Sequence, residues 1–113
     1  MASLHTSLLQ VIVFALSKRA CTDLADKLAQ MQVNDEQEAK LVDAIFWSAM
    51  DVLPEQDRNL PQVAQALPML RRGIGVHHSG LLPIVKEAIE VLFSEGLIKV
   101  LVSHGSAAGH RTA

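Results

Sequence analysis

Two short stretches of this 113-residue sequence combine residue types that can bind a phosphate group. The first, Ser17-Lys18-Arg19, places a hydroxyl and two cations at the predicted start of a helix, where backbone N–H groups lack partners. The second, His78-Ser79-Gly80, offers a hydroxyl donor beside a glycine, which allows another backbone or a ligand to approach closely. Both follow a predicted strand at its carboxyl end, where open α/β sheets place their ligands. The same residues also suit a capped helix and a tight turn, and residue types alone favour that plainer interpretation.

A further basic pair, Arg71-Arg72, lies at the predicted end of a helix. The helix dipole alone favours cations at that position, so the pair has a structural explanation beside the binding one. We treat Arg71 and Arg72, together with Arg19, as additional basic contacts rather than as the centre of a site.

The other candidate motifs favour structural roles. The sequence contains no G-x-x-x-x-G-K-[ST] phosphate loop, and Gly73-x-Gly75 lacks the third glycine of a dinucleotide fingerprint. His77 and His78 are adjacent in a predicted strand and so point to opposite faces, which disfavours a shared metal ion. Cys21 falls on the apolar stripe of a helix and is expected in the core. We therefore predict no catalytic residue and no metal site in this chain.

Composition limits the class of protein that can position these residues. Half of the residues are hydrophobic and 19% are charged, which is enough for the packed core of one small domain. The formal charge is -2, so the chain as a whole is not a polycation. Aromatic residues are scarce at 4%, which disfavours a platform for stacking bases. The sequence holds no apolar run of the ~20 residues that a membrane helix requires, and we expect no membrane partner.

The hydrophobic pattern predicts an α/β fold in which a short parallel sheet is flanked by helices. Strands are expected at 9–16, 74–77 and 97–102. Helices are expected after an N-cap at Ser17, from Asn34 to Leu53, from Pro61 to Arg72 and from Pro83 to Gly96, with a loop at 54–59.

The hydrophobic pattern also predicts which parts of the chain are buried and which are disordered. The run Val11–Phe14 is apolar throughout, which is typical of a strand covered on both faces. Because three strands are few for a parallel sheet, one long edge is expected to stay open. From Ser103 the apolar periodicity stops, so the expected organisation is a leader at 1–8, one partial domain at 9–102 and a disordered tail at 103–113.

Three strings of this sequence resemble a known family. They are VIVFALSKRAC (11–21), LPEQDRNLPQV (53–63) and, most specifically, LRRGIGVHHSGLLPIVKEAIEVLFSEGLIKVL (70–101). They are similar to the second RecA-like domain of the Ski2-like DExH-box RNA helicases, and most similar to its Mtr4 branch, the nuclear exosome helicases. The resemblance implies a partial RecA-like, P-loop NTPase-type domain of three layers, from helicase motif IV to just before motif V.

The resemblance also implies an activity, which is ATP-dependent 3′-to-5′ unwinding of RNA that is passed to the exosome. Its expected partners are single-stranded RNA, the first RecA domain of the helicase, the exosome and adaptor proteins. ATP and Mg²⁺ serve the full-length family, and no cofactor is expected in this chain alone. The implied compartment is the nucleus, or the cytoplasm for the Ski2 branch. Turns of this kind contact the RNA backbone in the family, so the implied RNA-binding residues are Ser17, Lys18, His78, Ser79 and Gly80.

The sequence departs from the family pattern after position 102, and the non-family tail follows. The family continues there with A-T-E-T-F, whereas this chain reads Ser103-His104-Gly105. The Walker A loop, the D-E-x-H box and motifs V and VI are not found in the sequence. We therefore expect a fragment that is inactive as an ATPase and helicase by itself. The alternative is a non-catalytic fragment that binds RNA or a partner protein.

Overall fold

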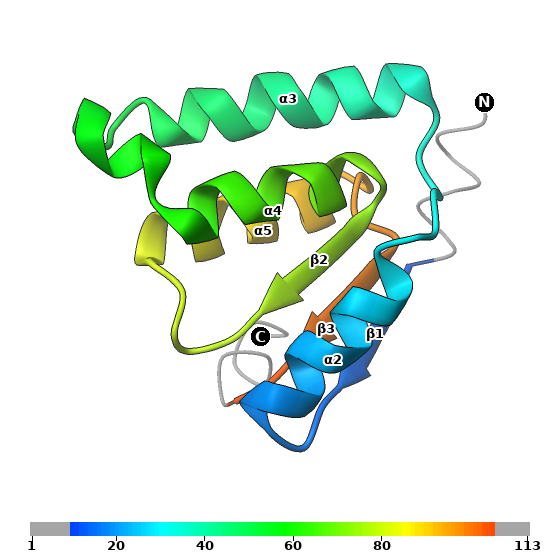
Figure 1. Ribbon diagram of the computed structural model, residues 1–113. Coiled ribbons are helices and arrows are strands. Elements are labelled where there is room, and N and C mark those ends of the chain that lie inside the picture. Colours follow the sequence, from blue (N-terminus) through cyan, green and yellow to red (C-terminus); the bar gives the residue numbers. More distant parts are fainter. Residues whose placement is uncertain (1–9, 106–113) are drawn as a thin grey trace.

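A short parallel sheet with helices against its faces is formed within residues 10–105, the part of the chain that the computed structural model describes (Figure 1). In chain order the elements are β1 (Val11–Phe14), α2 (Lys18–Leu28), α3 (Glu36–Met50), the 3-10 helix η1 (Glu55–Asn59), α4 (Pro61–Arg71), β2 (Ile74–His77), α5 (Pro83–Ser94) and β3 (Val100–Ser103). This arrangement confirms the predicted α/β class and is consistent with a partial RecA-like domain. Within this part of the chain, no helix has the length and apolar character needed to cross a bilayer.

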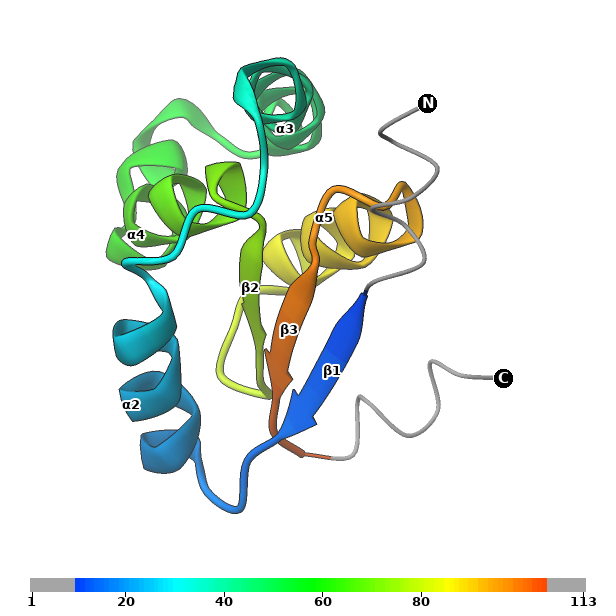
Figure 2. The ribbon, with the colours of Figure 1, turned by 90° about the vertical axis from the view of Figure 1, so that its right-hand side faces the viewer.

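The central strand of the sheet is β3, which comes last in the chain, and the spatial order is β1-β3-β2. Both pairings are parallel, with Val11 and Ile74 each opposite Val100. In Figure 2, α2 and α4 lie to one side of the sheet and α5 lies to the other. Because all three strands point the same way, their carboxyl ends meet at one edge of the sheet.

The core fills the space between the sheet and the helices, and α3 packs on both α4 and α5. The helix α5 presents an apolar face to the core, and four of its residues are buried. Those residues are Val85, Ala88, Ile89 and Leu92. Cys21 is also fully buried, as predicted, and burial raises the pKa of its thiol.

Several predicted boundaries need correction. The stretch expected as a loop at 54–59 contains η1, which begins after Pro54. The N-cap of α3 is Asp35 rather than Asn34, because the Asp35 carboxylate accepts from the Glu38 N–H while Asn34 bonds elsewhere. Ser103 is the last residue of β3 and is buried, so the ordered strand continues one residue past the predicted end. The predicted leader and residues 106–113 of the predicted tail lie outside the described residues.

The prediction that β1 is covered on both faces is wrong for this chain. Val11, Ile12 and Phe14 are 50%, 38% and 65% exposed. The physical reason is position: β1 is the outermost strand beside β3, and α2 contacts β2 and β3. The expected open edge is found here, since no described strand pairs with the outer side of β1.

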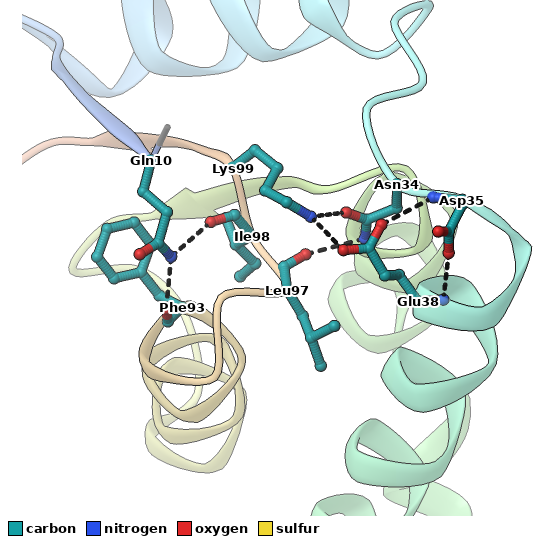
Figure 3. A network of polar contacts seen from close by, with 8 residues as sticks. All are labelled: Gln10, Asn34, Asp35, Glu38, Phe93, Leu97, Ile98 and Lys99. Atoms are coloured by element: carbon teal, nitrogen blue, oxygen red, sulfur yellow. Dashed lines mark hydrogen bonds and ion pairs between the residues drawn. The ribbon is translucent and has the colours of Figure 1, made fainter. Parts of the chain in front are cut away.

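A polar network joins the start of α3 to the chain that enters β3, at the amino ends of the strands (Figure 3). The ammonium group of Lys99, which is 5% exposed, donates to Asn34 Oδ1 and to Glu38 Oε2, the latter at 3.0 Å. Asn34 in turn donates from Nδ2 to the Leu97 carbonyl at 2.9 Å. Glu38 also completes the capping box of α3 by accepting the Asp35 N–H. The network therefore fixes the start of α3 against the chain that enters β3.

Candidate nucleic-acid interface

The structure brings the two predicted turns together at the carboxyl edge of the sheet. The first turn leads from β1 into α2, and the second leads from β2 towards α5. A Cβ atom added to Gly80 would lie 3.2 Å from Nζ of Lys18. The ammonium group of Lys18 in the first turn therefore lies close to the backbone of the second turn. Lys18 and Gly80 are more than sixty residues apart in sequence.

Ser17 serves as the N-cap of α2, as predicted. Its Oγ accepts the Ala20 N–H at 3.0 Å, and its extended backbone directs the following residues into the helix. This contact uses one lone pair of the hydroxyl and leaves the hydroxyl proton available for donation. The plain structural role and the predicted binding role of Ser17 are thus compatible.

His78 is fixed by its own turn. The Gly80 N–H donates to Nδ1 of His78 at 3.0 Å, so the neutral ring carries its proton on Nε2. The pKa of His78 is lowered, first by burial and then by the positive charge of Lys18 and the nearby groups of His104, His77 and Lys86. At neutral pH the ring is therefore an uncharged Nε2–H donor beside a cation.

Crowding by neighbouring side chains, rather than an unusual backbone conformation, favours glycine at position 80. Gly80 does not have the positive φ that Gly73, Gly96 and Gly105 have. An added Cβ at Gly80 would, however, lie 3.1 Å from the His78 ring. Gln62 of α4 holds the other side of this turn, accepting the Leu82 N–H at 2.6 Å and reaching the Gly80 carbonyl at 3.5 Å. Ser79 is exposed in the turn between these constrained neighbours.

Three residues of this region were not among the predicted site residues: Gln62, Lys86 and His104. Lys86 lies near the start of α5, and its charge acts on His78. His104 was assigned to the disordered tail, whereas its N–H donates to the His77 carbonyl at 2.9 Å. For Lys86 a signal was available. Pro83 indicates that a helix begins directly after the second turn, which places Lys86 close to that turn. The sequence carries no comparable signal for Gln62.

The arginines predicted as additional contacts do not all join the interface. Arg19 is exposed next to Lys18. Arg71 and Arg72 precede β2 and so lie at the opposite edge of the sheet from the two turns. Arg71 forms a bidentate ion pair with Asp43: its Nε lies 2.8 Å from Oδ1 and its Nη2 lies 2.6 Å from Oδ2. This contact raises the pKa of Arg71. Arg72 donates to the Ala29 carbonyl, so both side chains have structural partners there.

A hydrogen bond between His77 and Glu90 supports the end of β2 next to the second turn. His77 Nε2 lies 3.0 Å from a carboxylate oxygen of Glu90 on α5. His77 is 2% exposed and points to the α5 side, away from His78, as expected for adjacent residues of a strand. Among the described residues, no three His, Cys, Asp or Glu side chains are grouped closely enough to hold a metal ion.

The chemistry available at the joined turns is anion binding. The ammonium group of Lys18 and the neutral imidazole of His78 lie beside Gly80, and the same two turns carry the hydroxyl groups of Ser17 and Ser79. The amino end of α2, which begins at Lys18, adds partial positive charge. Donors and a cation in this arrangement suit a phosphodiester oxygen and would not distinguish bases.

Comparison with known proteins points to helicases. No family model matches the chain. The sequence is 58% identical over 91 residues to the ATP-dependent RNA helicase mtr4 of Schizosaccharomyces pombe, covering 80% of this chain and 8% of that protein. It is 56% identical to the DExH-box ATP-dependent RNA helicase DExH9 of Arabidopsis thaliana and 52% identical to the exosome RNA helicase MTR4 of Homo sapiens. Each of these two alignments covers 80% of this chain and 9% of the relative. The chain thus spans about a tenth of the length of these relatives.

Proposed function

We propose a function for this chain from the premise that it belongs to the Mtr4 branch of the Ski2-like DExH-box RNA helicases. The chain supplies a contact to the RNA backbone within an ATP-dependent helicase that serves RNA processing and decay. In that setting the whole enzyme unwinds RNA in the 3′-to-5′ direction with ATP and Mg²⁺. Its partners are the first RecA domain, the exosome and exosome adaptors, and its compartment is the nucleus.

The observation that carries this proposal is the position of Lys18 over the second turn. Two turns from distant parts of the sequence share one cation, and an added Cβ at Gly80 would crowd that cation. Such a site favours a phosphate of single-stranded RNA, because backbone contacts give affinity without reading the base sequence. The scarcity of aromatic residues agrees with binding through the backbone rather than through stacked bases.

The proposal is tested by replacing Lys18 with glutamine and measuring binding of a fluorescently labelled oligouridylate by anisotropy. Loss of one phosphate contact should weaken binding and reduce the slope of log affinity against log salt by about 0.7. Lys27→Gln is the matched control, because it removes the same charge from the last turn of the same helix, away from the site. Equal effects of the two substitutions would show that only net charge matters and would contradict the proposed site.

The isolated 113-residue chain is proposed to lack ATP hydrolysis. Phosphoryl transfer needs a phosphate-binding loop, metal-binding carboxylates, a positioned water and arginine side chains in one cleft. The sequence contains neither the Walker A loop nor the D-E-x-H box. A phosphate-release assay with RNA present should therefore give the background rate, and RNA-stimulated turnover would overturn this part of the proposal. RNA binding without turnover also describes the alternative function, a non-catalytic binding module.

A further inference from the structure

Gln62 lies in the first turn of α4 and contacts the chain between β2 and α5. Its Oε1 accepts the Leu82 N–H at 2.6 Å, and its Nε2 donates to the Gly80 carbonyl at 3.5 Å. Because a backbone N–H can only donate, Leu82 fixes Oε1 on its own side and leaves Nε2 facing Gly80. One side chain from a separate helix therefore holds two backbone groups of the second turn.

These contacts complete a set of hydrogen bonds around Gly80. The Gly80 N–H donates to Nδ1 of His78 at 3.0 Å, which is a bond within the turn. The Gly80 carbonyl receives its bond from outside the turn, from Gln62. The same backbone lies beside Lys18, whose Nζ would be 3.2 Å from a Cβ added at position 80. The place of the Gly80 backbone therefore decides where the Lys18 ammonium group can lie.

The second turn depends on support from outside because its own residues restrain it weakly. Ser79 and Gly80 are exposed, so side-chain packing does little to fix them. Gly80 has no Cβ, which widens the range of backbone conformations open to it. Leu82 is the N-cap of α5, and its apolar side chain cannot accept a hydrogen bond from the first turn of that helix. Gln62 supplies the missing restraint from α4.

We propose that Gln62 is a positioning residue of the RNA interface, which holds the Gly80 backbone where it directs the Lys18 ammonium group towards a phosphate. This inference rests on the proposed function, because it requires that Lys18 binds RNA. Both polar atoms of Gln62 are bonded to the turn, and the side chain carries no charge. The contribution of Gln62 to RNA affinity therefore passes through Lys18.

The test replaces Gln62 with methionine, which keeps the length of the side chain and removes the amide. In the anisotropy assay with labelled oligouridylate, Gln62→Met should weaken binding about five-fold, the effect of one hydrogen bond of ordinary strength. The slope of log affinity against log salt should also fall, although no charge is removed, because Lys18 engages the phosphate less fully. A purely structural defect would lower the folded fraction and leave that slope unchanged. Gln65→Met is the matched control, since Gln65 is exposed on the next turn of α4.

A double substitution separates this inference from the proposed function. In the Lys18→Gln background, Gln62→Met should cause no further loss of affinity, because the contact through which it acts is already removed. Equal losses in the two backgrounds, or equal effects of Gln62→Met and Gln65→Met, would overturn the positioning role. If Lys18→Gln has no more effect than Lys27→Gln, the proposed function fails instead.

A second variant keeps the test decisive if Gln62→Met does not fold. Gln62→Asn retains the amide but is one methylene shorter, so it cannot span the Leu82 N–H and the Gly80 carbonyl together. Gln65→Asn is its control on the exposed face of α4. Gln62→Asn should weaken RNA binding and lower the salt slope relative to Gln65→Asn. Equal affinity and equal slope for the two variants would overturn the proposal.

Discussion

Lys18 and His78 have different electrostatic roles although both can be cations. Lys18 begins α2, is exposed and supplies the cationic side chain of the interface. His78 is half-buried beside that charge, and both its burial and its basic neighbours lower its pKa. The Gly80 N–H on Nδ1 further requires an unprotonated acceptor. The interface therefore combines one fixed charge with one neutral donor.

The lowered pKa of His78 makes folding stability depend on pH. The unfolded chain binds a proton near pH 6.5, whereas the folded chain binds it only at lower pH, so acidification through about 6.5 favours the unfolded state. His78→Asn keeps an acceptor for the Gly80 N–H and removes the titration. Urea unfolding near pH 7.5 and near pH 5.5 should show a larger loss of stability for the parent than for His78→Asn. Equal losses in the two proteins would contradict this account of His78.

At the scale of elements, the end of the sheet opposite the turns is held by the network around Lys99. This side chain links β3 to the start of α3 through Asn34 and Glu38, and Gln10 adds bonds to the Phe93 and Ile98 carbonyls at 2.6 and 2.9 Å (Figure 3). Glu38 belongs both to this network and to the capping box. The Asn34 and Lys99 side chains are buried, so loss of the ammonium group would remove a charged hydrogen-bond donor from Asn34 and Glu38.

Lys99→Met should lower the free energy of unfolding by about 3 kcal/mol, because it leaves a largely buried carboxylate at Glu38 without its cation. Lys40→Met is the matched control on exposed surface of α3 and should change stability by less than about 0.5 kcal/mol. Urea unfolding measures both. Since the network lies at the opposite edge of the sheet from Lys18, RNA binding by folded Lys99→Met should equal that of the parent. A loss below about 1 kcal/mol would show that the network adds little to stability.

Most elements follow from local sequence. β2 has the predicted bounds, and the helices opened by Pro61 and Pro83 begin at those residues, because proline fixes the first turn. The errors arise where distant partners decide the outcome. The α3 cap lies at Asp35 because the Asn34 amide bonds Leu97, and the exposure of β1 depends on its place in a strand order that periodicity does not specify.

For the whole molecule, the parallel sheet explains why two turns far apart in sequence form one interface. The sequence predicted both turns, because each follows a strand, but not that Lys18 would lie over Gly80. It also placed Arg71 and Arg72 among the additional contacts, whereas the topology puts them at the other edge with partners at Asp43 and Ala29. Residue types indicate where anions can bind, and strand order decides which of those places combine.

We propose that the two turns act as one contact for RNA. Hydrogen exchange measured by mass spectrometry, with and without single-stranded RNA, tests this on the unsubstituted chain. We expect slower exchange on RNA addition in peptides covering 17–19 and 78–80 together, with no change in peptides covering 71–72. Protection of one turn without the other, or protection centred on Arg71 and Arg72, would contradict it.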